Sequence, residues 1–339
     1  MLWKVKLKKG ERMMKSKRLI LVSLILAVTL SVIGLAVNAL NNDRDSQDTE
    51  ASIMVDGLKR TYLMHTPPDR DQSKPLPLVI VLHGGGGSGA GMVESTQGGF
   101  NVLADEEGFV VAYPDAVENH WNDGRSKEEV DYRAHRENID DVGFISALID
   151  QLVKEENVAP QRVYVTGMSN GAMMTYRLAG ELSEKITAAA PVDGNIPENL
   201  AANYTPGKPV SMLVINNTAD PLMPWQGGDI TGPFGNKKLG KVLSARESIE
   251  LWVKHNQCSI IPAETTKLDN DSNDGTQVRR ITYTGGLEGT EVILYAIEGG
   301  GHTWPAGSSK LPERVIGKTS QEINANEVIW NFFKNHLRQ

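Results

Sequence analysis

Residues 162–179, RVYVTGMSNGAMMTYRLA, decide the fold, because a strand pattern passes directly into a helix pattern through the pentapeptide at 167–171. Residues 162–166 are β-branched and aromatic, which predicts a strand, and residues 172–179 are mostly good helix formers. The pentapeptide has the form G-x-S-x-G, in which a tight strand-to-helix turn exposes a serine hydroxyl to a histidine that can take its proton. Ser169 is therefore a candidate nucleophile, although a Gly-rich turn with a solvated serine would look the same in isolation.

Short apolar runs alternate with helical patterns on both sides of this turn. Residues 77–82 and 211–215 are uninterrupted hydrophobic runs, as in strands that are buried on both faces of a parallel sheet. The alternation predicts the α/β class, with a mostly parallel, doubly wound sheet flanked by helices in a single domain over 53–339. Strands are expected at 61–65, 76–82, 109–113, 162–166, 187–192, 210–216, 278–283 and 291–297, and helices at 91–106, 140–155, 172–182, 244–256 and 320–337. The polar stretches 225–238 and 263–277 are expected to be surface insertions.

Charge and cysteine content exclude several classes of function. Residues 1–18 contain eight Lys or Arg and one acid, which leaves 27 bases against 41 acids in the rest of the chain, a balance of −14. An acidic body argues against a nucleic-acid partner, which requires a basic face. Cys258 is the only cysteine, so no intramolecular disulfide forms, and no Cys/His cluster has zinc spacing. We expect neither a metal nor a cofactor.

The N-terminal segment predicts export. Residues 19–40 run for 22 residues without a charge and follow the basic segment 1–18, which suits either a cleaved signal peptide or a signal anchor. In both cases the remainder lies outside the cytoplasm, either secreted or held at the membrane through 19–40. Residues 41–52 are polar and acidic and are expected to be a flexible linker, with the folded domain starting at 53.

Ligands of an open parallel sheet bind beyond the carboxyl ends of its strands, so polar residues that directly follow the expected strands are candidates for a binding or catalytic site. The run HGGGGSG at 83–89 follows the strand 76–82. Its flexible backbone can bring the N–H of Gly84 or Gly85, together with that of Asn170, to a developing oxyanion. A phosphate loop is the alternative, but the nucleotide-binding fingerprints are absent.

An acid and a histidine complete this constellation. Asp220 follows the strand 210–216 and is favoured over Asp193, which follows the preceding strand, because Asp220 follows the second strand after the serine and leaves the chain order Ser…Asp…His intact. His302 follows the last strand within a glycine-rich segment, and the other six histidines lie in less suitable places. In this arrangement Ser169 attacks a carbonyl carbon, His302 takes its proton, Asp220 orients the imidazole, and water then cleaves the acyl-enzyme.

With these residues placed, the chain resembles the α/β-hydrolase esterases of the secreted polyhydroxybutyrate depolymerase-like and feruloyl esterase group. The resemblance spans about residues 54–339 and rests on HGGGGSG at 83–89, YPDA at 113–116, WNDG at 121–124, DDVGF at 140–144, GMSNGAM at 167–173, TADP at 218–221 and GGHTWP at 300–305. The segment INNT at 215–218 departs from the glycine-containing form expected before the acid. The resemblance implies an ester hydrolase whose triad is Ser169, Asp220 and His302.

The ester itself remains open at this stage. Feruloyl or acetyl esters of plant polysaccharide come first, and short polyhydroxyalkanoate esters second. Trp121, Trp225 and Trp304 flank the motif loops and could stack on a cinnamoyl ring or a sugar, or could simply be packing residues. A serine peptidase and a non-catalytic binding module on the same fold are further alternatives. No feature of the sequence indicates the oligomeric state.

Overall fold

A computed structural model describes residues 48–338, apart from residues 69, 72, 234, 236, 237, 271 and 272. The expected basic segment 1–18, the apolar segment 19–40 and linker residues 41–47 lie outside these described residues. Within the described ranges, no helix has the length and apolar character needed to cross a membrane.

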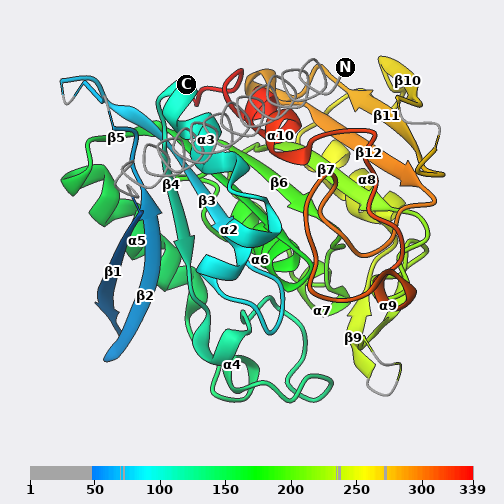
Figure 1. Ribbon diagram of the computed structural model, residues 1–339, viewed down its shortest axis with the longest axis horizontal. Helices are drawn as coiled ribbons and strands as arrows, with labels where there is room; N and C mark the ends of the chain where they lie inside the picture. The colour runs from blue at the N-terminus through cyan, green and yellow to red at the C-terminus, as the bar shows by residue number, and fades with distance from the viewer. Residues whose placement is uncertain are drawn as a thin grey trace, which may run out of the picture. The chain divides into compact units, whose positions relative to one another are not determined.

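A ten-stranded sheet forms the centre of the domain, with the strand order β1-β2-β4-β3-β5-β6-β7-β12-β11-β10 (Figure 1). The six central strands, β4-β3-β5-β6-β7-β12, pair in parallel. At the two edges, β1 and β2 on one side and β11 and β10 on the other pair antiparallel. This confirms the expected α/β class and mostly parallel sheet. The strands are β1 (Asp48–Val55), β2 (Leu58–His65), β3 (Leu76–Leu82), β4 (Val110–Pro114), β5 (Val158–Met168), β6 (Ala188–Val192), β7 (Ser211–Asn217), β10 (Glu264–Leu268), β11 (Gln277–Tyr283) and β12 (Val292–Glu298), with β8 (Gly228–Thr231) and β9 (Lys238–Val242) in a separate hairpin.

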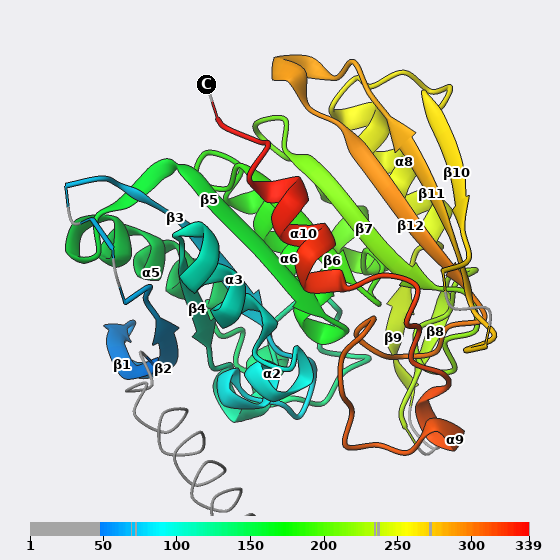
Figure 2. The same cartoon turned by 45° about the horizontal axis from the view of Figure 1, so that its top comes forward.

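Helices cover both faces of this sheet (Figure 2). Successive side chains of β3 show why its sequence is uninterruptedly apolar: Ile80 and Leu82 join the core that includes α5, α6 and α8, whereas Val81 joins the core that includes α3 and α10. The helices are α2 (Gly89–Ser95), α3 (Gly99–Glu107), α4 (Arg133–Arg136), α5 (Asp141–Glu155), α6 (Asn170–Glu181), α7 (Glu198–Ala201), α8 (Ala245–His255), α9 (Glu313–Ile316) and α10 (Ala325–Phe333), with 3₁₀ turns η1 (Val117–Asn119) and η2 (Leu287–Gly289).

Several boundaries differ from the sequence-based expectation, including the helix expected over 320–337, which is α10 over Ala325–Phe333. The start of the domain and the helix expected over 91–106 differ most. The domain begins at Asp48 rather than 53, so residues 48–52 of the expected linker belong to β1. His65 explains this difference, because its ring lies 2.8 Å from an Asp48 oxygen and 2.9 Å from an Asp105 oxygen, which ties the start of β1 to α3. The helix expected over 91–106 is two helices, since Gln97 and Gly98 adopt left-handed φ angles of 54° and 67° between them.

The expected insertions also contain regular structure. Residues 225–238 include β8 and the start of β9, and residues 263–277 include β10, which pairs with β11 at the sheet edge. The polar faces of these short strands conceal them in the sequence, because their alternation is too brief to be distinguished from loop composition.

A buried ion pair connects β2 to the N-terminus of α5. Arg60 and Asp141 approach to 2.6 Å with side chains 3% and 0% exposed. The guanidinium also lies 4.0 Å from the centre of the Phe144 ring, and the second Asp141 oxygen accepts a hydrogen bond from the N–H of Asn122 at 2.7 Å. The pair thereby fixes the segment that leads into the WNDG motif.

Replacing Arg60 with Met is expected to lower the free energy of unfolding by about 3–5 kcal/mol, because Asp141 is then left buried without its cation. The double variant Arg60→Met/Asp141→Leu, which removes both charges, is expected to recover most of this loss. Urea unfolding followed by tryptophan fluorescence measures both values. A single variant as stable as the wild-type protein would contradict the assigned role of the pair.

Candidate active site

Ser169 occupies the turn between β5 and α6 in a strained backbone conformation, with φ 58° and ψ −115°. Few non-glycine residues adopt such angles, and those that do concentrate at functional sites. The turn is held by a hydrogen bond from the N–H of Ser169 to the carbonyl of Val192 at 3.0 Å. A Cβ atom on Gly171 would lie 2.5 Å from the carbonyl oxygen of Leu82, so only glycine permits α6 to start this close to the end of β3.

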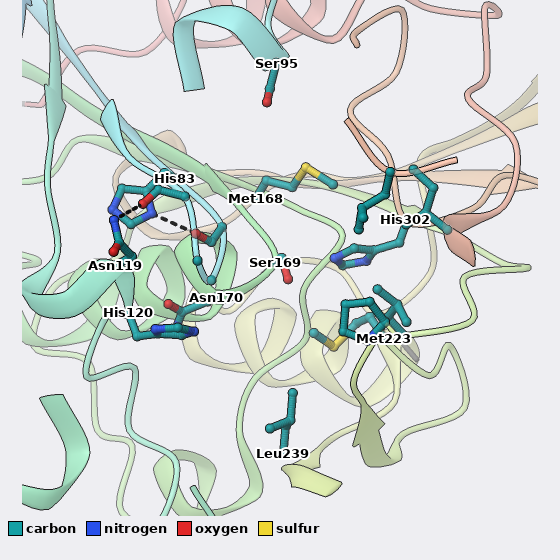
Figure 3. A pocket seen from close by; sticks show the side chains of 18 of the residues that line it. His83, Ser95, Asn119, His120, Met168, Ser169, Asn170, Met223, Leu239 and His302 are labelled. Carbon is teal, nitrogen blue, oxygen red and sulfur yellow. Dashed lines mark hydrogen bonds between the residues drawn. The ribbon is translucent and has the colours of Figure 1, made fainter. Parts of the chain in front are cut away.

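Asp220 and His302 meet beyond the ends of β7 and β12. One Asp220 oxygen lies 2.6 Å from Nδ1 of His302, and the other accepts the backbone N–H groups of Leu222 and Met223 at 2.7 and 2.9 Å. In neutral His302 the proton therefore resides on Nδ1, which leaves the lone pair on Nε2. Figure 3 shows the imidazole directed toward Ser169 across the cleft.

The environment of His302 favours its protonated form. Burial alone would lower the pKa of the imidazole, but the charge and hydrogen bond of Asp220, followed by the charge of Asp193, raise this pKa to about 9. Because the imidazolium is stabilised in this way, the neutral imidazole is a strong enough base to accept a proton from a weak acid such as a serine hydroxyl.

The glycine run after β3 lies against the turn that carries Ser169. A Cβ atom on Gly84 would be 3.5 Å from Cβ of Ser169, and one on Gly85 would be 3.7 Å from Cβ of Asn170. His83 holds the loop, since its Nε2 accepts the N–H of Ala116 at 3.1 Å, and its Nδ1 is 2.7 Å from the carbonyl of Gly84. Burial lowers the pKa of His83, as suits a neutral structural histidine.

Asn170 has its side chain fully engaged, so that only its backbone remains to face a ligand. The side-chain oxygen accepts the N–H of Trp121 at 2.8 Å, and the amide nitrogen donates to the Trp121 carbonyl and to Asp123 at 3.1 and 2.5 Å. Burial raises the pKa of Asp123, but the charges of Arg125 and His135 outweigh it and hold this pKa well below its usual range. The structure thus brings together all six residues proposed for the triad and the oxyanion site.

The three tryptophans considered as stacking surfaces for a substrate do not line the cleft around Ser169. Trp121 and Trp304 are 0% and 1% exposed, and neither is among the residues that line the cleft. The indole N–H of Trp121 donates to the carbonyl of His83, and that of Trp304 donates to Asn326, so both are packing residues. Trp225 borders a small hollow beside Asp193 and Asp220 instead. For Trp121 and Trp304 the structure therefore favours the packing alternative, whereas a substrate-lining role of Trp225 stays a prediction.

The cleft around Ser169 has a volume of about 500 Å³ and walls that the sequence did not reveal. One wall is apolar and is formed by Met173, Met223, Ile230 and Leu239. On another side the rings of His120 and Tyr132 stack with their centres 3.6 Å apart and 14° between their planes. Of these wall residues, the sequence motifs include only Met173, which ends the segment GMSNGAM at 167–173. The others come from irregular or polar segments without a periodic pattern.

Asp193, the competing acid, lies next to Asp220 and His302. None of the hydrogen bonds between described residues joins Asp193 to the imidazole. Its carboxylate accepts N–H groups of Asn217 and Thr303 instead. Of the two acids considered from the sequence, Asp220 is therefore the partner of His302.

Known proteins resemble this chain in sequence and in fold. A family model described as "Esterase PHB depolymerase" matches residues 60–196. NocK of Nocardia uniformis subsp. tsuyamanensis, whose name gives it as a candidate esterase, is 31% identical over 295 residues, which are 85% of this chain and 83% of that protein. The bifunctional acetylxylan esterase/xylanase XynS20E of Neocallimastix patriciarum is 32% identical over 38% of this chain and 17% of its own length. Feruloyl esterase B of Piromyces equi is 25% identical over 58% of this chain and 34% of its own length.

A solved structure extends the comparison to the fold. The acetyl xylan esterase from Aspergillus awamori is 16% identical, with a TM-score of 0.51 over 75% of this chain and 94% of that one. Three findings agree: the similarity to NocK along most of both chains, the match to the family model, and the similar fold. The chain therefore belongs to the polyhydroxybutyrate depolymerase-like and feruloyl esterase group of the α/β-hydrolase superfamily, and it is a carboxylic-ester hydrolase.

Proposed function

We propose that this protein is an exported serine esterase that works through an acyl-enzyme on Ser169. The observation that carries the proposal is the placement of the strained Ser169 in the same cleft as His302, whose Nδ1 lies 2.6 Å from Asp220. A serine that is exposed on a strand-to-helix turn and faces a histidine with its own carboxylate is the arrangement that activates a hydroxyl for acyl transfer.

The steps follow from the geometry. Nε2 of His302 removes the proton as Oγ of Ser169 bonds to the ester carbonyl carbon, and Asp220 stabilises the resulting imidazolium. The N–H of Asn170 and that of Gly84 or Gly85 donate to the tetrahedral oxyanion. His302 then protonates the leaving alcohol, and water repeats the sequence on the acyl group, which restores free Ser169.

The substrates that we propose are feruloyl or acetyl esters of plant polysaccharide. The names of two relatives, an acetylxylan esterase/xylanase and a feruloyl esterase, support this class. The cleft adds support, because its apolar wall suits an acyl chain and the stacked pair of His120 and Tyr132 offers a flat surface to an aromatic ring. Short hydroxyalkanoate esters are the second candidate, favoured by the description of the matching family model.

Export is part of the proposal and rests on the sequence alone. The basic residues 1–18 and the uncharged residues 19–40 direct the following domain across a membrane, where polymeric esters are accessible. The segment is either removed as a signal peptide or kept as an anchor.

Replacing Ser169 with Ala is expected to lower kcat for p-nitrophenyl acetate by roughly 10⁴-fold or more, because the acyl-enzyme can no longer form. Ser95→Ala is the matched control, since Ser95 lines the same cleft while its hydroxyl donates to the carbonyl of Gly91 at 2.9 Å. Initial rates of both variants decide the point. Activity in Ser169→Ala that equals that of the wild-type protein would remove Ser169 as the nucleophile.

The pH dependence is expected to follow His302. The imidazole must be neutral to accept the serine proton, and its pKa is raised to about 9, so kcat/KM should increase with pH through an alkaline midpoint. Protonation at lower pH removes the base and with it the activity. Measurement of kcat/KM on a non-ionising ester from pH 5 to 10 tests this. A plateau that is already reached at pH 6 would show that the carboxylates do not raise this pKa.

The aromatic wall is expected to select for ring-bearing acyl groups. Tyr132→Leu should raise KM for methyl ferulate about 2- to 13-fold, the equivalent of a lost aromatic contact, and leave KM for p-nitrophenyl acetate within twofold. Tyr283→Leu, which alters a tyrosine outside the cleft, is the control.

A hydrolysis panel compares the substrate classes directly. Methyl ferulate or acetylated xylan is expected to be cleaved with a higher kcat/KM than hydroxybutyrate oligomers. The reverse order would identify the hydroxyalkanoate esters as the substrate class.

A further inference from the structure

Asp193 is a buried carboxylate that the proposed reaction steps do not use. It follows β6 directly, is 1% exposed, and adopts a left-handed φ of 48°. Its backbone N–H donates to the carbonyl of Ile215 at 2.8 Å, which fixes it beside the end of β7. A buried charge in a sparsely populated conformation is costly to keep, so its surroundings must compensate for it.

Among the residues that the structure describes, the hydrogen-bond partners of this carboxylate are all N–H donors. One oxygen accepts the backbone N–H of Asn217 at 3.0 Å and the side-chain amide of Asn217 at 2.8 Å. The other accepts the same side-chain amide at 2.7 Å and the backbone N–H of Thr303 at 2.9 Å. Donors on both oxygens suit the ionised form, because a carboxylic acid would direct its own proton at one of them.

These contacts connect Asp193 to the triad from two sides. Thr303 immediately follows His302, so the bond to its N–H anchors the backbone that carries the imidazole. Asn217, at the end of β7, also donates to the carbonyl of Thr303 at 3.3 Å. A Cβ atom on Gly300 would lie 2.0 Å from the Asn217 side-chain oxygen, so glycine at this position lets the histidine loop close over the amide.

The charge of Asp193 also reaches the imidazole. One oxygen from each of Asp193 and Asp220 and one ring nitrogen of His302 all lie within 4.8 Å of one another. The charged groups that act on Asp193 are Asp220 and His302, and those that act on His302 are Asp220 and Asp193. Two carboxylates thus face one imidazole, with their separation set by the ends of β6 and β7.

We propose that Asp193 is a positioning residue of the active site, which holds the His302 loop through Thr303 and Asn217 and places a second negative charge beside the imidazolium. This inference rests on the proposed serine esterase mechanism. Burial, followed by the charge of Asp220, raises the pKa of Asp193, whereas the His302 imidazolium and the Asn217 donors oppose this increase and favour the carboxylate. The carboxylate and the imidazolium therefore stabilise each other.

The test compares Asp193→Asn with the wild-type full-length protein. Loss of the charge should destabilise the imidazolium, so the midpoint of the kcat/KM profile should move to lower pH by about 1 unit. Loss of the bond to Thr303 should lower kcat by about 10- to 100-fold through a displaced imidazole, with KM changed less than about threefold. The pKa of His302, followed by NMR of its ring C–H, should decrease in parallel and does not depend on turnover.

Asp274→Asn is the matched control. Asp274 accepts hydrogen bonds from Thr276 and Gln321 near the same loops, but its charge is not among those that act on His302. The control should leave the midpoint unchanged. An Asp193→Asn midpoint equal to that of the wild-type protein, with an unchanged His302 pKa, would overturn the proposal.

Two further variants keep the test decisive if Asp193→Asn does not fold. Asp193→Ser removes the charge with a smaller side chain and should give the same shift of the midpoint. Asn217→Ala keeps the charge but loses the amide, so kcat should fall while the midpoint stays alkaline; an unchanged kcat would contradict the positioning role. Failure of the esterase mechanism itself would appear differently, as full activity in Ser169→Ala.

Discussion

Parallel pairing of neighbouring strands is the constraint on which the whole site depends. The register aligns Leu82 of β3 with Gly167 of β5, Met168 with Val192 of β6, and Val192 with Ile215 of β7. Every candidate catalytic group follows one of these strands or the adjacent β12, so each begins at the same edge of the sheet. Loops of only a few residues then suffice to bring the serine, the acid, the histidine and the glycine run into one cleft.

This arrangement concentrates backbone strain and buried charge at one edge. Ser169 and Asp193 both adopt positive φ angles, and the carboxylates of Asp193 and Asp220 share one imidazole. Strained and buried charged groups persist only where the surrounding structure holds them in place. Here the backbone N–H groups of Asn217 at the end of β7, of Leu222 and of Thr303 donate to the two carboxylates. The sheet fixes the positions of these donors, because its strands have apolar side chains packed on both faces.

The sequence was sufficient for eight of the ten strands of the sheet, but not for the edge strands β1 and β10. It also indicated the proposed triad, because Ser169, Asp220 and His302 each follow a strand with a recognisable hydrophobic pattern. It could not place the substrate walls. Trp121 flanks a motif loop and was considered either as a stacking surface or as a packing residue, and burial of its large apolar area and a bond from its indole N–H to the carbonyl of His83 fix it in the core. Tyr132 lies in an irregular segment without a period, so its stack on His120 becomes visible only when the chain is folded.

One buried carboxylate connects the apolar wall of the cleft to the turn that carries Ser169. Asp123 accepts hydrogen bonds from the side chains of Asn170 and Arg125, and Arg125 reaches on to the carbonyl of Leu239 at 2.7 Å. Leu239 belongs to the apolar wall, and Asn170 carries the proposed oxyanion donor. Because Asp123 and Arg125 are almost fully buried, neither can move without exposing an unpaired charge to an apolar environment. The position of the wall and the direction of the N–H are therefore held by the same ion pair, so in the proposed mechanism the acyl-binding wall and the oxyanion donor depend on one pair of buried charges.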